Sequence, residues 1–300
     1  MKHSTRRRVR LAAAGIALTL AAGGCGSASA GTDDAATGEV AVDQQIRAML
    51  PDAVRDRGSI QLATDPSYAP MESYAPDGRT IIGFDADLAA ALGSITGIRV
   101  EMVAADFSSA IDETVKGTYD GVLSSMTDTA EREKLVDFVD YFSAGTAIVV
   151  QRGNPRGISD LKDLCGQVVA VEKSTVQADL LRRSQPSCGA NKMIIKNFKT
   201  NADALLQVRT GRAVAILNDY PPAAHLATDA RTRSYYQLAS TVQYEPGLMG
   251  LAVAKDNTGL RDALRAALDS LIRSGRYTEL LQRWGLMNGA LASSSINAGS

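Results

Sequence analysis

The sequence predicts an α/β fold in two lobes, and three observations support this prediction. Apolar, strand-like segments alternate with amphipathic, helix-like segments along most of the chain, which is typical of mostly parallel sheets flanked by helices. The alternation forms two series, which meet near the "GNP" at 153–155. A final apolar strand and two helices follow the "YEPG" at 244–247, where the chain would return to the first lobe. Two crossings make a natural hinge, and ligands of such sheets bind beyond the carboxyl ends of the strands.

The first series begins with an amphipathic segment over 42–58, which predicts a helix that ends at a glycine. The apolar segment 59–65 predicts a strand, and a Pro-Asp-Gly turn predicts a hairpin between short strands over 71–74 and 80–84. The same patterns predict a helix over 85–97, a strand over 98–105, a helix over 107–117, a strand over 119–126, a short helix over 128–136 and a strand over 144–152.

The second series has the same alternation, and the return segment ends in two helices. The series predicts strands over 167–173, 193–198, 213–219 and 236–240, with helices over 174–184, 200–211 and 220–229. The return segment predicts a strand over 247–255, a long amphipathic helix over 257–275 and a shorter helix over 276–285.

The N-terminus has the pattern of an export signal. A basic stretch is followed by a short apolar run and then by small residues. The "LAAGGC" at 20–25 resembles a bacterial lipobox, which would make 1–24 the signal peptide and Cys25 the lipidated residue. The alternative is a plain signal cleaved near the "SASA" at 27–30, with Cys25 incidental. A tether over 25–42 would follow, because this stretch is rich in Gly, Ala, Ser and Thr.

Composition and cysteine count narrow the class of protein. The net charge is −1 and 22% of residues are charged, which gives no reason to expect a nucleic-acid partner. Export permits a disulfide, and Cys165 with Cys188 is the simplest pairing; two buried thiols are the alternative. No metal site or cofactor is expected, because His225 is the only histidine after the signal and the chain has no CxxC or HxxxH.

Polar and aromatic residues follow the predicted strands where each one ends. They are Asp65, Tyr68, Asp106, Phe107, Ser125, Thr127 and Arg132 in the first series, and Glu172 to Gln177, Asn218 and Asp219 in the second. Arg132 would stand in the first turn of a helix, where a cation gains nothing from the helix dipole, so a negative ligand would explain its position. Arg can hold a carboxylate and Asp an ammonium, so the set suits a zwitterion.

Six segments of the chain carry a family resemblance: "TDPSYAPMES", "GFDADLAAAL", "FSSAIDETVKGTYDGVLSSMTDTAEREKLVDFVDYF", "GQVVAVEKSTVQADLL", "GRAVAILNDYP" and "LDSLIRSGRYTELLQRWG". Together they resemble family 3 of the extracellular solute-binding proteins, the amino-acid-binding components of ABC importers. The resemblance covers about 58–285. It implies a type II periplasmic-binding-protein fold, with lobe 1 over 43–149 and 246–288, lobe 2 over 150–245, and a disordered tail over 289–300.

The resemblance also implies roles for ten residues. Arg132 would clamp the α-carboxylate of the ligand, assisted by Thr127, Thr175 and the N–H of Val176, because the free N–H groups of a helix start bind anions. The Ser125 carbonyl and the Asp219 carboxylate would hold the α-ammonium. The side-chain pocket would be lined by Asp65, Tyr68, Phe107 and Glu172. The two acids in that pocket favour a cationic ligand.

Several of these residues also have an ordinary structural interpretation. Arg132 could pair with neighbouring carboxylates on a solvated face. Asp219 could cap the following helix, and Tyr68 and Phe107 could be core aromatics.

The resulting expectation is a monomeric receptor outside the cell, lipid-anchored to the outer face of the membrane. It would capture a polar amino acid by hinge closure and deliver it to an ABC permease. The ATPase would be a separate subunit, because the chain has no phosphate loop. Two alternatives stay open: an enzyme similar to cyclohexadienyl or arogenate dehydratases, with Glu172 as general acid, and a sensor that signals to a partner protein.

Overall fold

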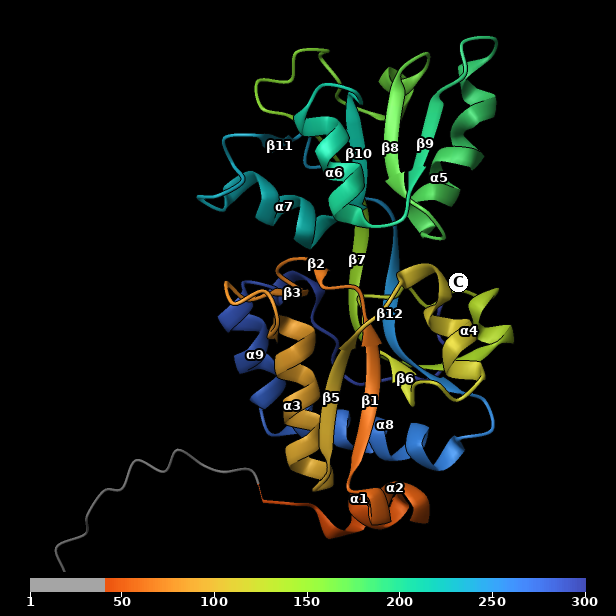
Figure 1. Cartoon of the computed structure of the whole chain (residues 1–300), viewed down its shortest axis with the longest axis vertical. Coiled ribbons are helices and arrows are strands. Elements are labelled where there is room, and N and C mark those ends of the chain that lie inside the picture. Colours follow the sequence, from red (N-terminus) through yellow and green to blue (C-terminus); the bar gives the residue numbers. More distant parts are fainter. Residues whose placement is uncertain (1–40) are drawn as a thin grey trace, which may run out of the picture. The chain divides into compact units, whose positions relative to one another are not determined.

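The computed structural model describes residues 41–300 (Figure 1). The predicted signal peptide, Cys25 and nearly all of the predicted tether lie outside the described residues. None of the helices over 41–300 is long and apolar enough to cross a membrane.

One nine-stranded sheet extends through both lobes, in the order β5-β1-β6-β12-β7-β10-β8-β9, with β11 paired to β7. Its strands are β1 (Ser59–Thr64), β5 (Arg99–Ala104), β6 (Gly121–Val122), β7 (Val136–Gln151), β8 (Val168–Glu172), β9 (Ile194–Phe198), β10 (Ala215–Asp219), β11 (Tyr236–Leu238) and β12 (Tyr244–Ala254). The pairs β1–β5, β1–β6, β10–β8 and β8–β9 are parallel. A small antiparallel sheet contains β2 (Ser67–Tyr68), β3 (Glu72–Tyr74) and β4 (Ile81–Ile82), so the predicted hairpin is confirmed.

The antiparallel strands β7 and β12 are the two crossings between the lobes (Figure 1). Lobe 1 contains β1 to β6 and the helices α1 (Gln44–Met49), α2 (Asp52–Arg57), α3 (Phe84–Thr96), α4 (Ala110–Val115), α8 (Thr258–Arg273) and α9 (Arg276–Trp284). Lobe 2 contains β8 to β11 and the helices α5 (Val176–Ser184), α6 (Asn201–Arg209) and α7 (Tyr220–Thr228). Short 3₁₀ turns occur at Phe107–Ser109, Arg132–Lys134, Leu161–Leu164, Gln185–Cys188 and Met287–Gly289.

Each lobe has its own hydrophobic core. In lobe 1, α8 buries Leu260, Leu264, Leu268 and Leu271, whose spacing of three and four residues places them on one helix face. In lobe 2 the sheet is covered on both faces. Side chains alternate along β10, so Ala215 and Leu217 join one cluster and Ile216 joins the other. The predicted two-lobed α/β architecture therefore holds.

Two helix predictions differ from the structure. The helix expected over 42–58 is interrupted, because Pro51 has no N–H for a continuing helix; α1 ends at Met49 and α2 begins at Asp52. The short helix expected over 128–136 is wrong. Only a 3₁₀ turn forms at Arg132–Lys134, and Val136 already begins β7, because pairing with β12 along its length overrides local helix propensity.

The tail expected to be disordered over 289–300 is instead packed on lobe 1. Ile296 forms an antiparallel bridge with Val139, the Asp140 N–H donates to the Ser295 carbonyl at 3.0 Å, and the Asn297 N–H donates to the Phe138 carbonyl at 3.2 Å. The disorder prediction is wrong because these polar residues find backbone partners on β7, which composition does not reveal.

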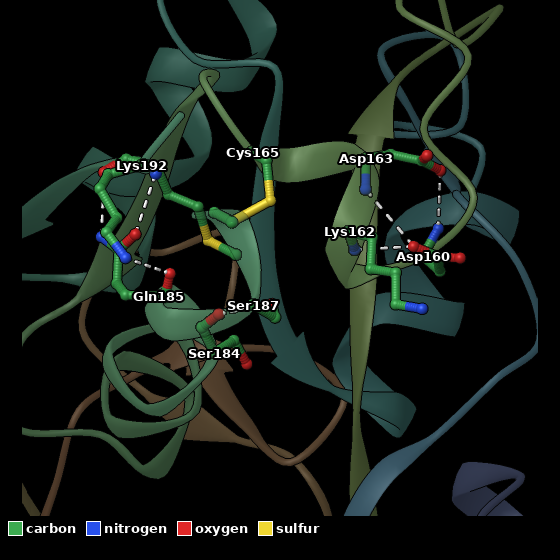
Figure 2. Close-up of a disulfide and its surroundings, with 10 residues drawn as sticks. Asp160, Lys162, Asp163, Cys165, Ser184, Gln185, Ser187 and Lys192 are labelled. Carbon is green, nitrogen blue, oxygen red and sulfur yellow. Dashed lines mark hydrogen bonds between the residues drawn. A yellow bond between two sulfur atoms is a disulfide. The ribbon is translucent and has the colours of Figure 1, made fainter. Parts of the chain in front are cut away.

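The predicted disulfide between Cys165 and Cys188 is present, with the two Cα atoms 5.3 Å apart (Figure 2). The alternative of two buried thiols is therefore excluded. Beside it, the Gln185 carbonyl accepts a hydrogen bond from Lys192 Nζ at 2.8 Å. The bridge ties the segment before β8 to the turn after α5.

Candidate functional site

A cavity lies between the lobes. All ten residues predicted to contact a ligand line it: Asp65, Tyr68, Phe107, Ser125, Thr127, Arg132, Glu172, Thr175, Val176 and Asp219. The prediction missed six others: Ser67, Glu72, Ser124, Gln177, Asn201 and Leu217. The residues meet here because the carboxyl ends of β1, β6, β8 and β10 all point toward the cavity, as expected for parallel strands.

Arg132 makes its contacts with backbone carbonyls rather than with carboxylates. Its Nη1 donates to the Thr127 carbonyl at 2.6 Å, and its Nη2 donates to the Ser174 carbonyl of lobe 2 at 2.9 Å. Its guanidinium carbon lies 5.6 Å from the centre of the Phe107 ring. Burial lowers the pKa of Arg132 to about 10, so the group stays charged at neutral pH. Among the described residues Arg132 has no ion pair, so the surface-pairing interpretation is wrong.

The start of α5 lies at the cavity, where Thr175 and Val176 line the wall. Thr175 caps the helix by accepting from the Ala178 N–H at 3.2 Å, and its hydroxyl donates to the Glu172 carbonyl at 2.8 Å. Ser174 has a φ of 62°, in the left-handed region that favours glycine, and its carbonyl accepts from Arg132. By contrast, the helix expected to begin near Arg132 is absent, since only a 3₁₀ turn forms there, so the guanidinium lacks the helix N–H groups expected beside it.

Asp219 is buried at the end of β10 and contacts both lobes. Its Oδ2 accepts from the Tyr68 hydroxyl at 2.9 Å, and its Oδ1 accepts from Gln177 Nε2 at 2.9 Å. The Tyr68 oxygen in turn accepts from the Asp219 N–H at 2.7 Å. Burial raises the pKa of Asp219 to about 7, although the Tyr68 hydrogen bond and the Arg132 charge oppose this. The side chain makes no capping bond to α7, so the capping alternative is wrong.

Hydrogen bonds and ion pairs join the lobes around the cavity, and Asp106 of lobe 1 pairs with Lys173 and Lys199 of lobe 2. Besides Tyr68–Asp219 and Arg132–Ser174, the Asn201 Nδ2 donates to the Ser67 carbonyl at 3.3 Å. The structure is thus a closed arrangement of the two lobes.

Asp65 and Glu172 form an acidic pair contributed by opposite lobes. Both are 8% exposed, and Asp65 Oδ2 and Glu172 Oε1 have no hydrogen-bond donor within the described chain. Burial, followed by the charge of Asp65, raises the pKa of Glu172 to about 9. Burial also raises the pKa of Asp65. The pair therefore holds a proton at neutral pH, and a cation placed beside it would favour the release of that proton.

A second buried acidic pair, Glu72 and Asp85, accepts hydrogen bonds from Ser124 and Ser125 of the cavity wall. Ser124 and Ser125 donate their hydroxyls to Glu72 at 3.2 and 3.1 Å. Asp85 Oδ2 accepts from the Ser125 N–H and from the Tyr141 hydroxyl, each at 2.9 Å. Burial raises the pKa of Glu72, and it raises that of Asp85 to about 6. These bonds fix Ser125, whose φ is 48°, at the cavity wall.

The missed residues carry only a partial signal in the sequence. Ser124 lies two residues after the end of β6 and Asn201 begins α6, so the strand-end and helix-start rules could have included them. Gln177 belongs to the residues that follow β8 but received no ligand role, yet it is 4% exposed and its side chain donates to Asp219. Nothing local identifies Glu72, because its partners lie about fifty residues further along the chain. Within 41–300, no group of three His, Cys, Asp or Glu residues could hold a metal ion.

Comparisons with known proteins point to a single family. The family described as "Bacterial extracellular solute-binding proteins, family 3" matches residues 60–287. The arginine-binding protein ArgT of Corynebacterium glutamicum is 30% identical over 259 residues, covering 84% of this chain and 83% of that protein. A solved ancestral arginine-binding protein bound to arginine has a TM-score of 0.70 and 29% identity, covering 76% of this chain and 98% of that one. The ancestral amino acid-binding protein AncCDT-1, a precursor of cyclohexadienyl dehydratase, has a TM-score of 0.69 and 32% identity, covering 78% and 98%.

Proposed function

Because the chain belongs to the bacterial extracellular solute-binding proteins of family 3, we propose that it is an ABC-importer receptor whose preferred ligand is a cationic amino acid, with arginine the best fit. The family and the two-lobed fold that the sequence predicted are both confirmed. ArgT is named an arginine-binding protein, and the ancestral structure described above is bound to arginine. Both relatives support a cationic amino acid as the ligand.

The observation that carries the proposal is the distribution of charge around the cavity. Arg132 supplies a cation at one part of the wall, and Asp219 supplies a carboxylate from the other lobe. Asp65 and Glu172 add two further acids, and neither forms an ion pair within the described residues. A zwitterion with a positive side chain complements this pattern, whereas an acidic side chain would meet like charge.

In the proposed complex, Arg132 turns its guanidinium N–H groups to the ligand carboxylate, together with the free N–H of Val176 and the Thr127 hydroxyl. Thr175 holds the start of α5 in place, because its hydroxyl donates to the Glu172 carbonyl and accepts from the Ala178 N–H. Asp219 and the Ser125 carbonyl accept from the α-ammonium. Tyr68 and Phe107 cover the aliphatic part of the side chain, which ends at Asp65 and Glu172.

Ligand capture then works through the hinge formed by β7 and β12. A ligand that bridges the lobes stabilises the closed state by its differential affinity for that state. A shift from mostly open to mostly closed needs about 5.5 kcal/mol of such preference. Two charge-assisted contacts, at roughly 1.5–3 kcal/mol each, supply most of it. A monomer suffices for this mechanism, since both walls of the cavity belong to one chain.

Isothermal titration calorimetry of the purified protein with the common amino acids tests the proposal. We expect arginine to bind most tightly, with lysine next and neutral amides weaker. Tight binding of glutamate alone would contradict the cationic assignment.

We further propose that Cys25 is lipidated and holds the receptor at the outer face of the membrane, where it delivers its ligand to a permease and a separate ATPase. The "LAAGGC" motif supports this. Metabolic labelling with a fatty acid should label the wild-type protein and not Cys25→Ala. Equal labelling of the two would exclude this anchor.

An enzymatic role is a second candidate, because AncCDT-1 is named a precursor of cyclohexadienyl dehydratase and Glu172 holds a proton that a general acid needs. We propose that the protein is not an enzyme, because Asp65 and Asp219 line the same cavity as Glu172 and together these acids suit the binding of a cationic ligand. Incubation with prephenate and arogenate should give no product; steady product formation abolished by Glu172→Gln would establish the dehydratase.

A further inference from the structure

Residues 295–299, here called the C-terminal strap, lie along the first half of β7. They are held by the Ile296–Val139 bridge and by the backbone bonds to Phe138 and Asp140 described above. Just before the strap, Ser294 donates through its N–H and its hydroxyl to Asp269 of α8, each at 2.9 Å. The strap thus continues the sheet of lobe 1 at the base of a crossing strand.

The strap supplies donors to three buried carboxylates. Ser295 Oγ donates to Asp140 at 2.6 Å, Asn297 Nδ2 to Asp137 at 2.9 Å, and the Gly299 N–H to Asp128 at 2.8 Å. Asp137 also pairs with two cations, Lys255 and Arg261. Asp128 and Asp140, which are 1% and 0% exposed, have no ion pair within the described residues, so they depend on the strap.

Asp128 connects the strap to the cavity wall. It directly follows Thr127, whose carbonyl accepts from Arg132 at 2.6 Å. The Asp128 N–H donates to the Leu248 carbonyl of β12 at 2.8 Å, and Thr127 bridges to Met249. A Cβ at Gly299 would lie 2.4 Å from the Asp128 carbonyl oxygen, so only glycine permits this approach.

We propose that the C-terminal strap positions residues 124–132, here called the ligand loop. The Gly299 N–H holds the Asp128 carboxylate, and Asp128 in turn fixes Thr127, whose carbonyl accepts a hydrogen bond from the Arg132 guanidinium. Burial and the neighbouring carboxyls of Asp140 and Glu133 raise the pKa of Asp128 to about 7. The hydrogen bond from the Gly299 N–H opposes this rise, so it stabilises the charged Asp128 at its buried position. The measurement of arginine affinity rests on the proposed function, whereas hydrogen–deuterium exchange reports on the ligand loop without any ligand.

The test compares two strap variants with a neighbouring control. Gly299→Ala forces the strap end away from Asp128, and a chain ending at Asn297 removes the Gly299 N–H altogether. Ser294→Ala is the control, because it removes bonds to α8 and touches no residue of the ligand loop. Each protein is measured by calorimetry with arginine, by thermal unfolding, and by hydrogen–deuterium exchange over 124–132 without ligand.

We expect both strap variants to have a Kd for arginine about tenfold higher than wild type, equivalent to ~1.4 kcal/mol. Their backbone amides over 124–132 should also exchange hydrogen for deuterium faster. Ser294→Ala should lower Tm while its Kd stays within twofold of wild type. Wild-type Kd and exchange in both strap variants would overturn the proposal, as would an equal loss of affinity in Ser294→Ala. If the wild-type protein binds no amino acid, the proposed function fails, and the exchange measurement alone decides about the strap.

Discussion

Arginine binding should release a proton from the Asp65–Glu172 pair. Burial and the charge of Asp65 raise the pKa of Glu172 to about 9, so this carboxyl is protonated at pH 7. A guanidinium beside the pair favours the charged form and returns the pKa toward its ordinary value of roughly 4.3. Because pH 7 lies two units below the pKa of about 9, releasing this proton at pH 7 costs ~3 kcal/mol. This cost makes the free energy of arginine binding less favourable.

The sign of the pH dependence follows from this release. Since the complex binds fewer protons than the empty protein, arginine affinity rises with pH, by about tenfold per unit while one proton is released, and levels off near pH 9. Asp219, with a pKa of about 7, also loses its proton when it meets an ammonium. Toward pH 8.5, well above the pKa of Asp219, that carboxyl is mostly ionised, so the slope there reports mainly Glu172.

Calorimetry at pH 8 in phosphate and in Tris measures the release directly, because the two buffers have different heats of protonation. We expect about one proton to reach the buffer per arginine bound by wild-type protein, and nearly none in Glu172→Gln, which cannot titrate at this position. Equal binding enthalpies in both buffers, together with a Kd that stays flat from pH 7.5 to 8.5, would refute the reasoning.

Three further predictions concern the clamp, the lobe contact and the disulfide. Arg132→Ala should abolish binding of any α-amino acid while the far-ultraviolet circular dichroism stays unchanged; near-normal calorimetric affinity would show that the carboxylate is held elsewhere. Tyr68→Phe should lower the free energy of unfolding by about 1–3 kcal/mol in urea titrations, because buried Asp219 loses a donor; an unchanged midpoint would mean that water replaces the hydroxyl. Replacing Cys165 and Cys188 together by serine should lower the free energy of unfolding by roughly 3 kcal/mol, since the bridge spans 23 residues, with arginine affinity retained. Equal stability of this variant and the wild type would indicate strain in the bridge.

The residues of the cavity were largely predictable because the rule that identified them is local. A strand such as β10 ends in "ND", and the carboxyl ends of parallel strands meet at one edge. Residues beside those ends, such as Ser125, Glu172 and Asp219, could therefore be selected without knowing which neighbour each would contact. The same rule overlooked Glu72, which lies on a hairpin strand and not at the end of a parallel one.

The sequence by itself determined the alternating α/β elements, the cysteine pair and the identity of most cavity residues, because hydrophobic period, turn residues and strand ends are properties of short segments. Only the tertiary structure decided that β7 begins at Val136 rather than at 144, that Gln177 contacts Asp219, and that residues 295–297 pack on β7. The partners in these contacts lie 42 to 160 residues apart along the chain. Hydrogen bonds, burial and the pKa values that follow from them depend on distance in space, which no local pattern contains.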